Sequence, residues 1–218
     1  MSYDRLHYET VEPILKDILY RLMLCPLFDR FRLVGGTALS LQLGHRVSVD
    51  IDLFTDAEYG SIDFVEIQSW LRSEFPYCDG ECGDNVGFGT YYMIGNSRNE
   101  CIKLDLYYTD SFIRPLKVVD NIRMAAVEEI AAMKISAVSR GGRKKDFWDI
   151  HELHNILPFS NMLDLYEERY PFENERADVI KSFYDFSRAD DEVDPRCLKG
   201  EIWQFIKMDI LEWIEEIQ

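Results

Sequence analysis

The stretch that decides the fold runs from residue 32 to residue 54 and reads RLVGGTALSLQLGHRVSVDIDLF. It opens with a short apolar run that predicts a strand over 31–34. A glycine pair then makes a tight turn, and the apolar residues 37–43 predict a helix. Residues 49–54 predict a second strand, which carries two aspartates one residue apart. The stretch therefore combines the pattern of a buried strand with two charges that a protein core does not readily accept.

The two aspartates, Asp50 and Asp52, lie on the same face of the predicted strand, because successive strand side chains point in opposite directions. Neighbouring carboxylates repel, and each raises the pKa of the other. A divalent cation such as Mg²⁺ relieves that repulsion and prefers carboxylate oxygens. The alternative is that both side chains face solvent on an edge strand or cap nearby turns. For such a short motif alone, that alternative is favoured.

A third acid strengthens the interpretation as a metal site. Asp105 lies between two leucines in CIKLDLYY, residues 101–108, which predicts a further strand. By itself Asp105 is also consistent with an exposed position on an amphipathic strand. Two strands that carry acids amid apolar neighbours can form a one-metal or two-metal carboxylate cluster, which suits phosphoryl or nucleotidyl transfer.

The glycine pair, Gly35 and Gly36, supplies a candidate phosphate site between a strand and a helix N-terminus. Glycines let the backbone approach a ligand, and free amides and the helix dipole favour an anion there. A hydroxyl from Thr37 or Ser40 would assist. The alternative is an ordinary turn that starts a helix.

The remaining pattern predicts an α+β fold, with a mixed β-sheet and flanking helices followed by a helical region. Strands are expected over 89–95 and 100–108, joined by the turn NSRN. Helices are expected over 8–24, 62–75, 127–139, from 143 onward, and through 161–218 with an acidic break at 189–195. We place a catalytic-type α/β core in residues 1–120 and the helical region that would complete its site in 121–218.

Composition restricts the class of protein. The 218 residues carry a net charge of −16, which argues against broad, non-specific binding to nucleic acid. The one dense basic run, RGGRKKD at 140–146, is either a solvated loop or a local contact for an RNA phosphate. The five cysteines show no zinc-like spacing and indicate reduced thiols in a cytoplasmic protein. No apolar stretch of membrane-spanning length and no signal peptide is expected.

Three motifs in order resemble the AbiEii/AbiGii toxin-type nucleotidyltransferases, a branch of the DNA polymerase β-like superfamily. The first is GGTALSLQLGHRVSVDIDLF, and the second is IKLDLYY. The third is VEEIAAMKISAVSRGGRKKDFWDI, which carries a lysine on one helix and KDFxD at the start of the next. The resemblance covers residues 33–151, while the last 60 or so residues match only as a generic helical tail.

The resemblance implies a role for each matching residue. Asp50 and Asp52 would bind the metal that holds a nucleoside triphosphate, and Asp105 would complete the cluster and act as general base. Gly35 and Gly36 would contact the triphosphate through backbone amides.

The later motif implies further roles. Lys134 would neutralise the triphosphate or the departing pyrophosphate, although the residues alone leave open that its charge simply reaches solvent. Asp149, and with less support Asp146, would complete the last motif; the two share one helix face. Ser48 lies where the family often has Ser or Thr. Arg46 would pair with the acids or with phosphates, or form a surface ion pair of little weight.

Together these features predict a metal-dependent nucleotidyltransferase that uses Mg²⁺ or Mn²⁺. It would transfer a nucleoside monophosphate from a nucleoside triphosphate to a hydroxyl of tRNA, another RNA or a protein. The resemblance implies the toxin of a toxin–antitoxin or phage-defence system, with a cognate antitoxin as partner. The alternative is a non-catalytic module that binds a nucleotide or a partner and retains the fold.

Overall fold

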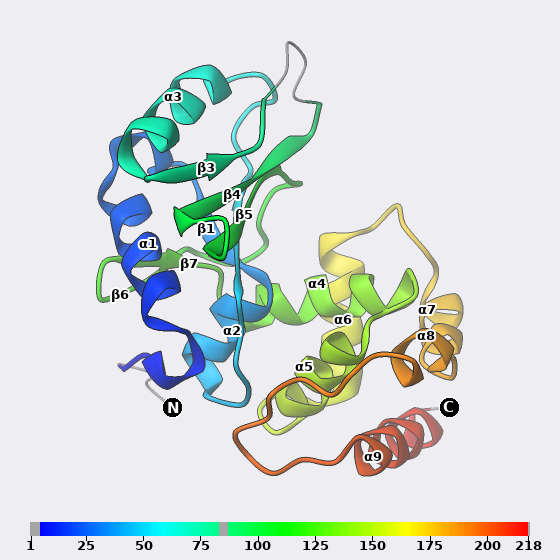
Figure 1. The fold of residues 1–218 in the computed structure, drawn as a ribbon. Helices are drawn as coiled ribbons and strands as arrows, with labels where there is room; N and C mark the ends of the chain where they lie inside the picture. Colours follow the sequence, from blue (N-terminus) through cyan, green and yellow to red (C-terminus); the bar gives the residue numbers. More distant parts are fainter. Residues whose placement is uncertain (1–4, 83–86, 218) are drawn as a thin grey trace.

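A computed structural model describes residues 5–82 and 87–217 and contains one seven-stranded mixed sheet (Figure 1). Its strand order is β3-β4-β5-β2-β1-β7-β6. The strands are β1 (Arg32–Val34), β2 (Asp50–Thr55), β3 (Tyr77–Asp79), β4 (Gly89–Ser97), β5 (Glu100–Tyr108), β6 (Lys117–Val119) and β7 (Ile122–Met124). The strand with both aspartates of the opening motif, β2, is therefore the central strand of the sheet.

Strand β2 alternates as its sequence predicts. Ile51 and Leu53 are fully buried, whereas Asp50 and Asp52 are partly accessible on the opposite face. Strand β2 runs antiparallel to β1 and parallel to β5. The apolar face packs against helix α1, so burial of this face fixes the direction in which the carboxylates point.

The helices form two groups (Figure 1). The first group lies with the sheet: α1 (Pro13–Leu24), α2 (Gly35–Leu43) and α3 (Phe64–Glu74). The second group builds the helical region: α4 (Val127–Ser139), α5 (Lys144–His154), α6 (Phe159–Arg169), α7 (Arg176–Ser182), α8 (Ser187–Asp190) and α9 (Trp203–Glu216). Helix α2 contacts β1 and β2 on one side and α4 and α5 on the other, so it joins the two groups.

The predicted α+β architecture is confirmed, with differences at element ends. The glycine pair is not a separate turn before the helix, because α2 begins at Gly35 itself. The first helix begins at Pro13 rather than at residue 8, where a short 3-10 turn (Tyr8–Thr10) precedes it. Proline is well tolerated at that first helical position, since its missing N–H has no partner there.

The C-terminal part is helical as predicted, but less continuously. The segment 191–202 contains no helix and runs back toward the sheet, where Arg46 and Cys197 form an antiparallel bridge. The hairpin of β6 and β7 lies on both sides of residue 120, and the division of the chain at that residue stays a prediction. Within the described ranges, no helix is both long and apolar enough to cross a membrane.

Candidate active site

The three predicted metal-binding carboxylates meet on one face of the sheet. Asp50 and Asp52 lie on β2, and Asp105 lies on the parallel neighbour β5. The register of the two strands places Asp105 directly beside Asp52. Cross-strand neighbours have side chains only about 5 Å apart. The edge-strand alternative is therefore wrong, because β2 is central and its acids adjoin a third one.

The three carboxylates lie so close together that their ionised forms repel one another. Burial, with the charges of Asp105 and Asp50, raises the pKa of Asp52 to about 6. Two lysines offset part of the negative charge. Lys103 Nζ lies 2.6 Å from Asp105 Oδ2, and Lys145 Nζ lies 3.7 Å from Asp50 Oδ2. The site thus holds more negative charge than its neighbours neutralise, which favours a cation.

The donor set fits a hard divalent cation. Clustered carboxylate oxygens beside space for phosphate and water are what Mg²⁺ prefers. Among residues 5–82 and 87–217, no three His, Cys, Asp or Glu side chains are already arranged around a common metal position. Lys103 holds Asp105, so this carboxylate would change partner when a metal binds. Metal binding by these acids stays a prediction.

The two glycines are required for different reasons. Gly35 has a positive φ of 67°, and a Cβ there would lie 2.5 Å from Asp52 Oδ2. At Gly36 a Cβ would lie 2.4 Å from Arg46 Nη2. The start of α2 therefore approaches one carboxylate and one guanidinium more closely than any larger residue permits.

Two of the three predicted hydroxyl groups support the loop before β2. The Thr37 hydroxyl is buried and contacts Ser48 Oγ at 2.8 Å and the carbonyl oxygen of Asp50. These contacts link the first turn of α2 to the residues that lead into Asp50 and Asp52. Ser40 is fully buried further along α2 and does not line a cavity of the site, so the structure does not bring it toward a ligand.

Beneath the carboxylates lies a buried ion cluster centred on Asp149 of α5. Arg46 donates to both of its oxygens, at 2.6 and 2.8 Å. Lys134 Nζ of α4 lies 2.7 Å from Asp149 Oδ2 and 2.7 Å from Asp146 Oδ1. His45 Nε2 lies 2.8 Å from Asp149 Oδ1. The surface ion pair considered for Arg46 is wrong, since its side chain is 3% exposed.

Opposite charges outweigh burial throughout this cluster. Although burial opposes the charged forms, Arg46 and Lys134 hold the pKa of Asp149 well below its usual range. Asp149 and Asp146 in turn raise the pKa of Lys134. The charge of Lys134 does not reach bulk solvent, because the residue is 6% exposed.

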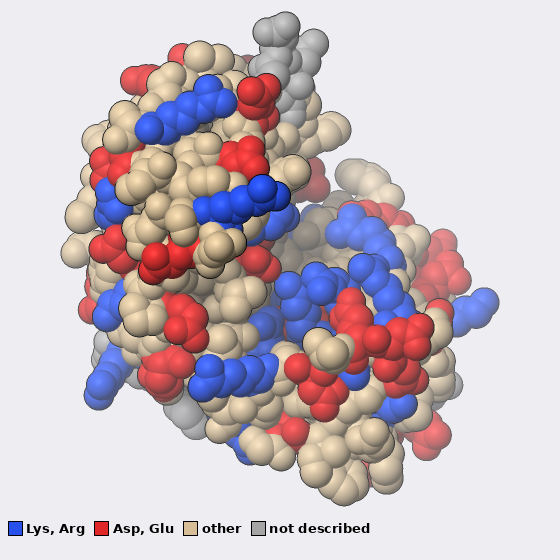
Figure 2. Space-filling model, viewed as in Figure 1, with Lys and Arg blue, Asp and Glu red and all other residues tan. Residues whose placement is uncertain are grey.

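A cavity of about 620 Å³ opens beside these groups, between the sheet, helix α4 and the segment that follows α6. Its charged end contains Gly35, Asp52 and Lys134, and its other side includes several aromatic rings. A second cavity of about 420 Å³ adjoins Asp50 and includes Arg143, Lys145 and Arg196. Figure 2 shows Lys and Arg side chains along the hollow between the sheet and the helical region.

Residues 17–211 match the family model described as the nucleotidyl transferase AbiEii toxin of a type IV toxin–antitoxin system. The chain belongs to the AbiEii nucleotidyltransferase family. The resemblance expected from the three motifs is thereby confirmed, as is the enzyme class. The match also includes most of the C-terminal helical region, which the motifs alone did not connect to the family.

Other proteins resemble this chain in sequence or in fold. An uncharacterised protein of Aquifex aeolicus is 28% identical over 196 residues, which cover 85% of this chain and 88% of the relative. A presumed nucleotidyltransferase of Helicobacter pylori superposes with a TM-score of 0.59 at 20% identity, over 94% of this chain and 95% of that one. MenT4, a nucleotidyltransferase toxin of Mycobacterium tuberculosis, gives 0.57 at 12% identity, over 94% and 84%.

Several groups of this AbiEii protein's site were missed by sequence reasoning. His45 contacts Asp149, and Lys145 approaches Asp50 from the basic run that was noted only as a whole. The aromatic part of the larger cavity was not foreseen, because its rings come from loops and strand ends without periodic spacing. The catalytic and ligand-binding roles of the predicted residues stay predictions.

Proposed function

We propose that this AbiEii protein transfers a nucleoside monophosphate from a nucleoside triphosphate to an acceptor hydroxyl, with a divalent metal. The observation that carries the proposal is the junction of three groups at one cavity: Asp52, which adjoins Asp50 and Asp105, the glycine start of α2, and Lys134. A volume of about 620 Å³ lies within the usual range for small-molecule sites.

Each group has a distinct task in the proposed reaction. Asp50, Asp52 and Asp105 would hold Mg²⁺ or Mn²⁺, which supplies charge stabilisation for the phosphates. Gly35 lets the triphosphate approach the backbone at the helix N-terminus. Lys134 faces the same cavity and neutralises phosphate charge. Asp149 acts as a positioning residue that holds Lys134 through a buried ion pair.

The reaction is an in-line displacement at the α-phosphorus. The acceptor oxygen forms a bond to that phosphorus, and the bond to the oxygen bridging the α and β phosphates breaks. Pyrophosphate leaves with the bonding electron pair. Asp105 accepts the hydroxyl proton, which requires that Lys103 move from its 2.6 Å contact or remain as a counter-ion beside it.

An RNA hydroxyl, with tRNA as the first candidate, suits the smaller cavity beside Asp50. Arg143, Lys145 and Arg196 line it together with Glu192 and Asp194, and Lys145, 3.7 Å from Asp50, is the cation that a phosphate of the acceptor strand would meet beside the reacting centre. The net charge of −16 confines such binding to this local basic surface. A protein acceptor is the alternative outcome of the same assay.

The test uses purified protein, Mg²⁺ or Mn²⁺, each α-labelled ribonucleoside triphosphate, and total tRNA. The variant Asp50→Asn, Asp52→Asn removes two site charges. The matched control Asp17→Asn, Asp178→Asn removes two exposed charges elsewhere. We expect metal-dependent label transfer to RNA by the wild type and the control, and none by the site variant. Transfer that persists in the site variant, or requires no metal, would overturn the proposal; label on protein would reassign the acceptor.

We also propose that the activity is toxic and is countered by a cognate antitoxin, as in a type IV system. Induced expression should arrest growth of a bacterial host, and expression of the Asp50→Asn, Asp52→Asn variant should not. Co-expression of the adjacent gene should restore growth. Arrest by both proteins would show that toxicity does not depend on this site.

A further inference from the structure

The end of the larger cavity away from the carboxylates is aromatic. We call Tyr59, Phe88 and Tyr108 the aromatic end; all three line the cavity. Tyr59 is 64% exposed and Phe88 is 77% exposed. Large apolar rings left open to solvent inside a cavity indicate a surface that a ligand covers.

The position of the aromatic end follows from the two parallel strands. On β5, Tyr108 lies three residues after Asp105, and on β2, Phe54 of the cavity wall lies two residues after Asp52. At a rise of about 3.3 Å per residue, Phe54 lies roughly 7 Å beyond Asp52 along β2, on the same face of the strand. One cavity thus has a charged end at Asp52 and an aromatic end beyond Phe54.

The rings are held in place by the protein. The hydroxyl of Tyr108 accepts a hydrogen bond from the backbone N–H of Ile62 at 2.9 Å, and its ring packs edge-on against Phe64 at 5.9 Å. Tyr59 lies 5.3 Å from the Tyr108 ring and 5.9 Å from the Phe88 ring, tilted by 52° and 54°. With both neighbours in place Tyr59 is still 64% exposed, so much of its ring remains available to a ligand.

The opposite wall supplies polar groups to the same space. Arg140 and Glu173, from the end of α4 and the turn after α6, line the cavity 3.8 Å apart. A flat heteroaromatic ring with hydrogen-bonding edges matches an aromatic surface that faces such polar groups better than an aliphatic ligand does.

We propose that the aromatic end is the nucleobase subsite, in which Tyr59 stacks on the base of the triphosphate whose phosphates lie at Asp52 and Lys134. The inference rests on the proposed function, since it concerns the same substrate. It makes Tyr59 a residue for nucleotide affinity, with Tyr108 as its support. Stacking of a base on an aromatic side chain is sequence-tolerant, so selectivity among bases would come from the facing polar pair.

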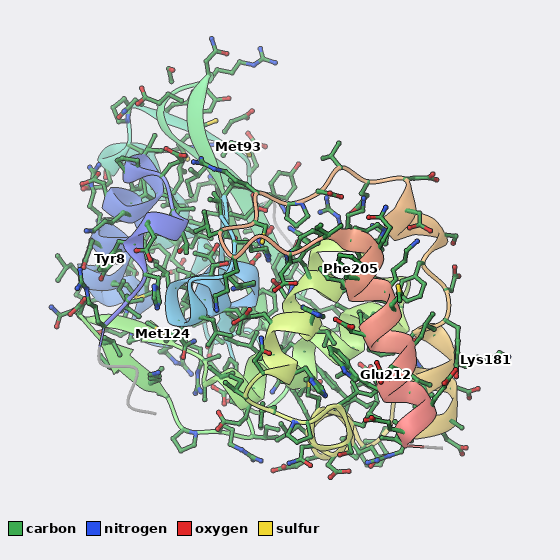
Figure 3. The ribbon with its side chains drawn as sticks, turned by 90° about the horizontal axis from the view of Figure 1, so that it is seen from below. Tyr8, Met93, Met124, Lys181, Phe205 and Glu212 are labelled. Atoms are coloured by element: carbon green, nitrogen blue, oxygen red, sulfur yellow. The ribbon has the colours of Figure 1, made fainter. Side chains whose placement is uncertain are left out.

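The experiment measures binding by calorimetry in Mg²⁺ for each ribonucleoside triphosphate and for inorganic tripolyphosphate, which has no base. Tyr59→Leu removes the ring and keeps an apolar side chain, and Tyr59→Phe keeps the ring. Phe205→Leu is the matched control, because Phe205 is a similarly exposed ring on α9 (Figure 3).

We expect Tyr59→Leu to weaken binding of the preferred nucleotide about tenfold, with tripolyphosphate changed by less than about twofold. Tyr59→Phe and Phe205→Leu should bind like the wild type. Equal affinity of wild type and Tyr59→Leu for the nucleotide overturns the inference, as does an equal loss for both ligands.

The two proposals fail differently. If the wild type binds neither tripolyphosphate nor any nucleotide, the proposed function itself fails, and the inference fails with it. If tripolyphosphate binds and the base adds no affinity, only the nucleobase subsite is refuted. Phe88→Leu provides a second variant should Tyr59→Leu not fold, and a smaller loss in the same direction is expected because Phe88 is the outer ring.

Discussion

Replacement of Asp52 by Asn should stabilise the metal-free protein while abolishing metal binding. Burial and two neighbouring carboxylates raise the pKa of Asp52 from 3.8 to about 6. One pKa unit corresponds to about 1.4 kcal/mol, so the ionised side chain costs the folded state about 3 kcal/mol at neutral pH. Asn has nearly the same shape without the charge, and it avoids that cost.

The sign of the pH dependence follows from the same shift. Between pH 4 and 6 the folded protein binds a proton at Asp52 that the unfolded chain has lost, so wild-type stability falls as pH rises through this window. The Asn variant lacks this fall. Its advantage should therefore be near zero below about pH 4 and complete above about pH 6.

Thermal unfolding in EDTA checks this expectation. For a chain of this size, about 3 kcal/mol corresponds to a rise in Tm of roughly 6–12 °C at pH 8. Asp178→Asn, which removes an exposed charge, should leave Tm nearly unchanged. Mg²⁺ should then stabilise the wild type and not Asp52→Asn, because the ion binds the folded carboxylates. An Asn variant less stable than wild type at pH 8, or a difference independent of pH, would refute the reasoning.

Three further changes test other parts of the site. Asp149→Asn should destabilise the fold by about 3–5 kcal/mol in denaturant titrations, since it leaves two buried cations without their common partner; an effect below 1 kcal/mol would contradict a central role. Gly35→Ala should reduce stability and tripolyphosphate binding, whereas Gly200→Ala, which also has a positive φ but open space, should reduce only stability. Lys103→Met should raise Mg²⁺ affinity severalfold by freeing Asp105, and unchanged affinity would show that Lys103 does not compete with the metal.

Much of the fold could be predicted because its signals are periodic. The alternation of β2 identified which face carries Asp50 and Asp52, and burial of Ile51 and Leu53 bears this out. The helix over 127–139 was predicted with its observed bounds, since acids at its start and glycines after its end mark both termini. Periodicity did not reveal that β2 lies at the centre of the sheet, because strand order depends on long-range pairing.

The candidate site was predictable only in part for the same physical reason. The carboxylates could be named from their strands, whereas the partner of Lys134 could not be. Lys134 and Asp149 are on different helices, and their contact depends on how α4 and α5 pack. Tyr59 and Phe88 lie in loops, where no spacing rule predicts which side chains line a cavity.

The ion cluster explains how a site divided between two parts of the chain keeps its geometry. Asp149 of α5 holds Arg46, which directly precedes the loop that leads into Asp50. On its other side, this loop is paired with the segment 191–202 through Val47 and Arg196. The loop that precedes Asp50 and Asp52 is therefore held in place by groups of the helical region as well as by the sheet. Since that region also supplies Lys134 to the cavity, the same ion cluster keeps the lysine and the carboxylates in one relative position, as the proposed reaction requires.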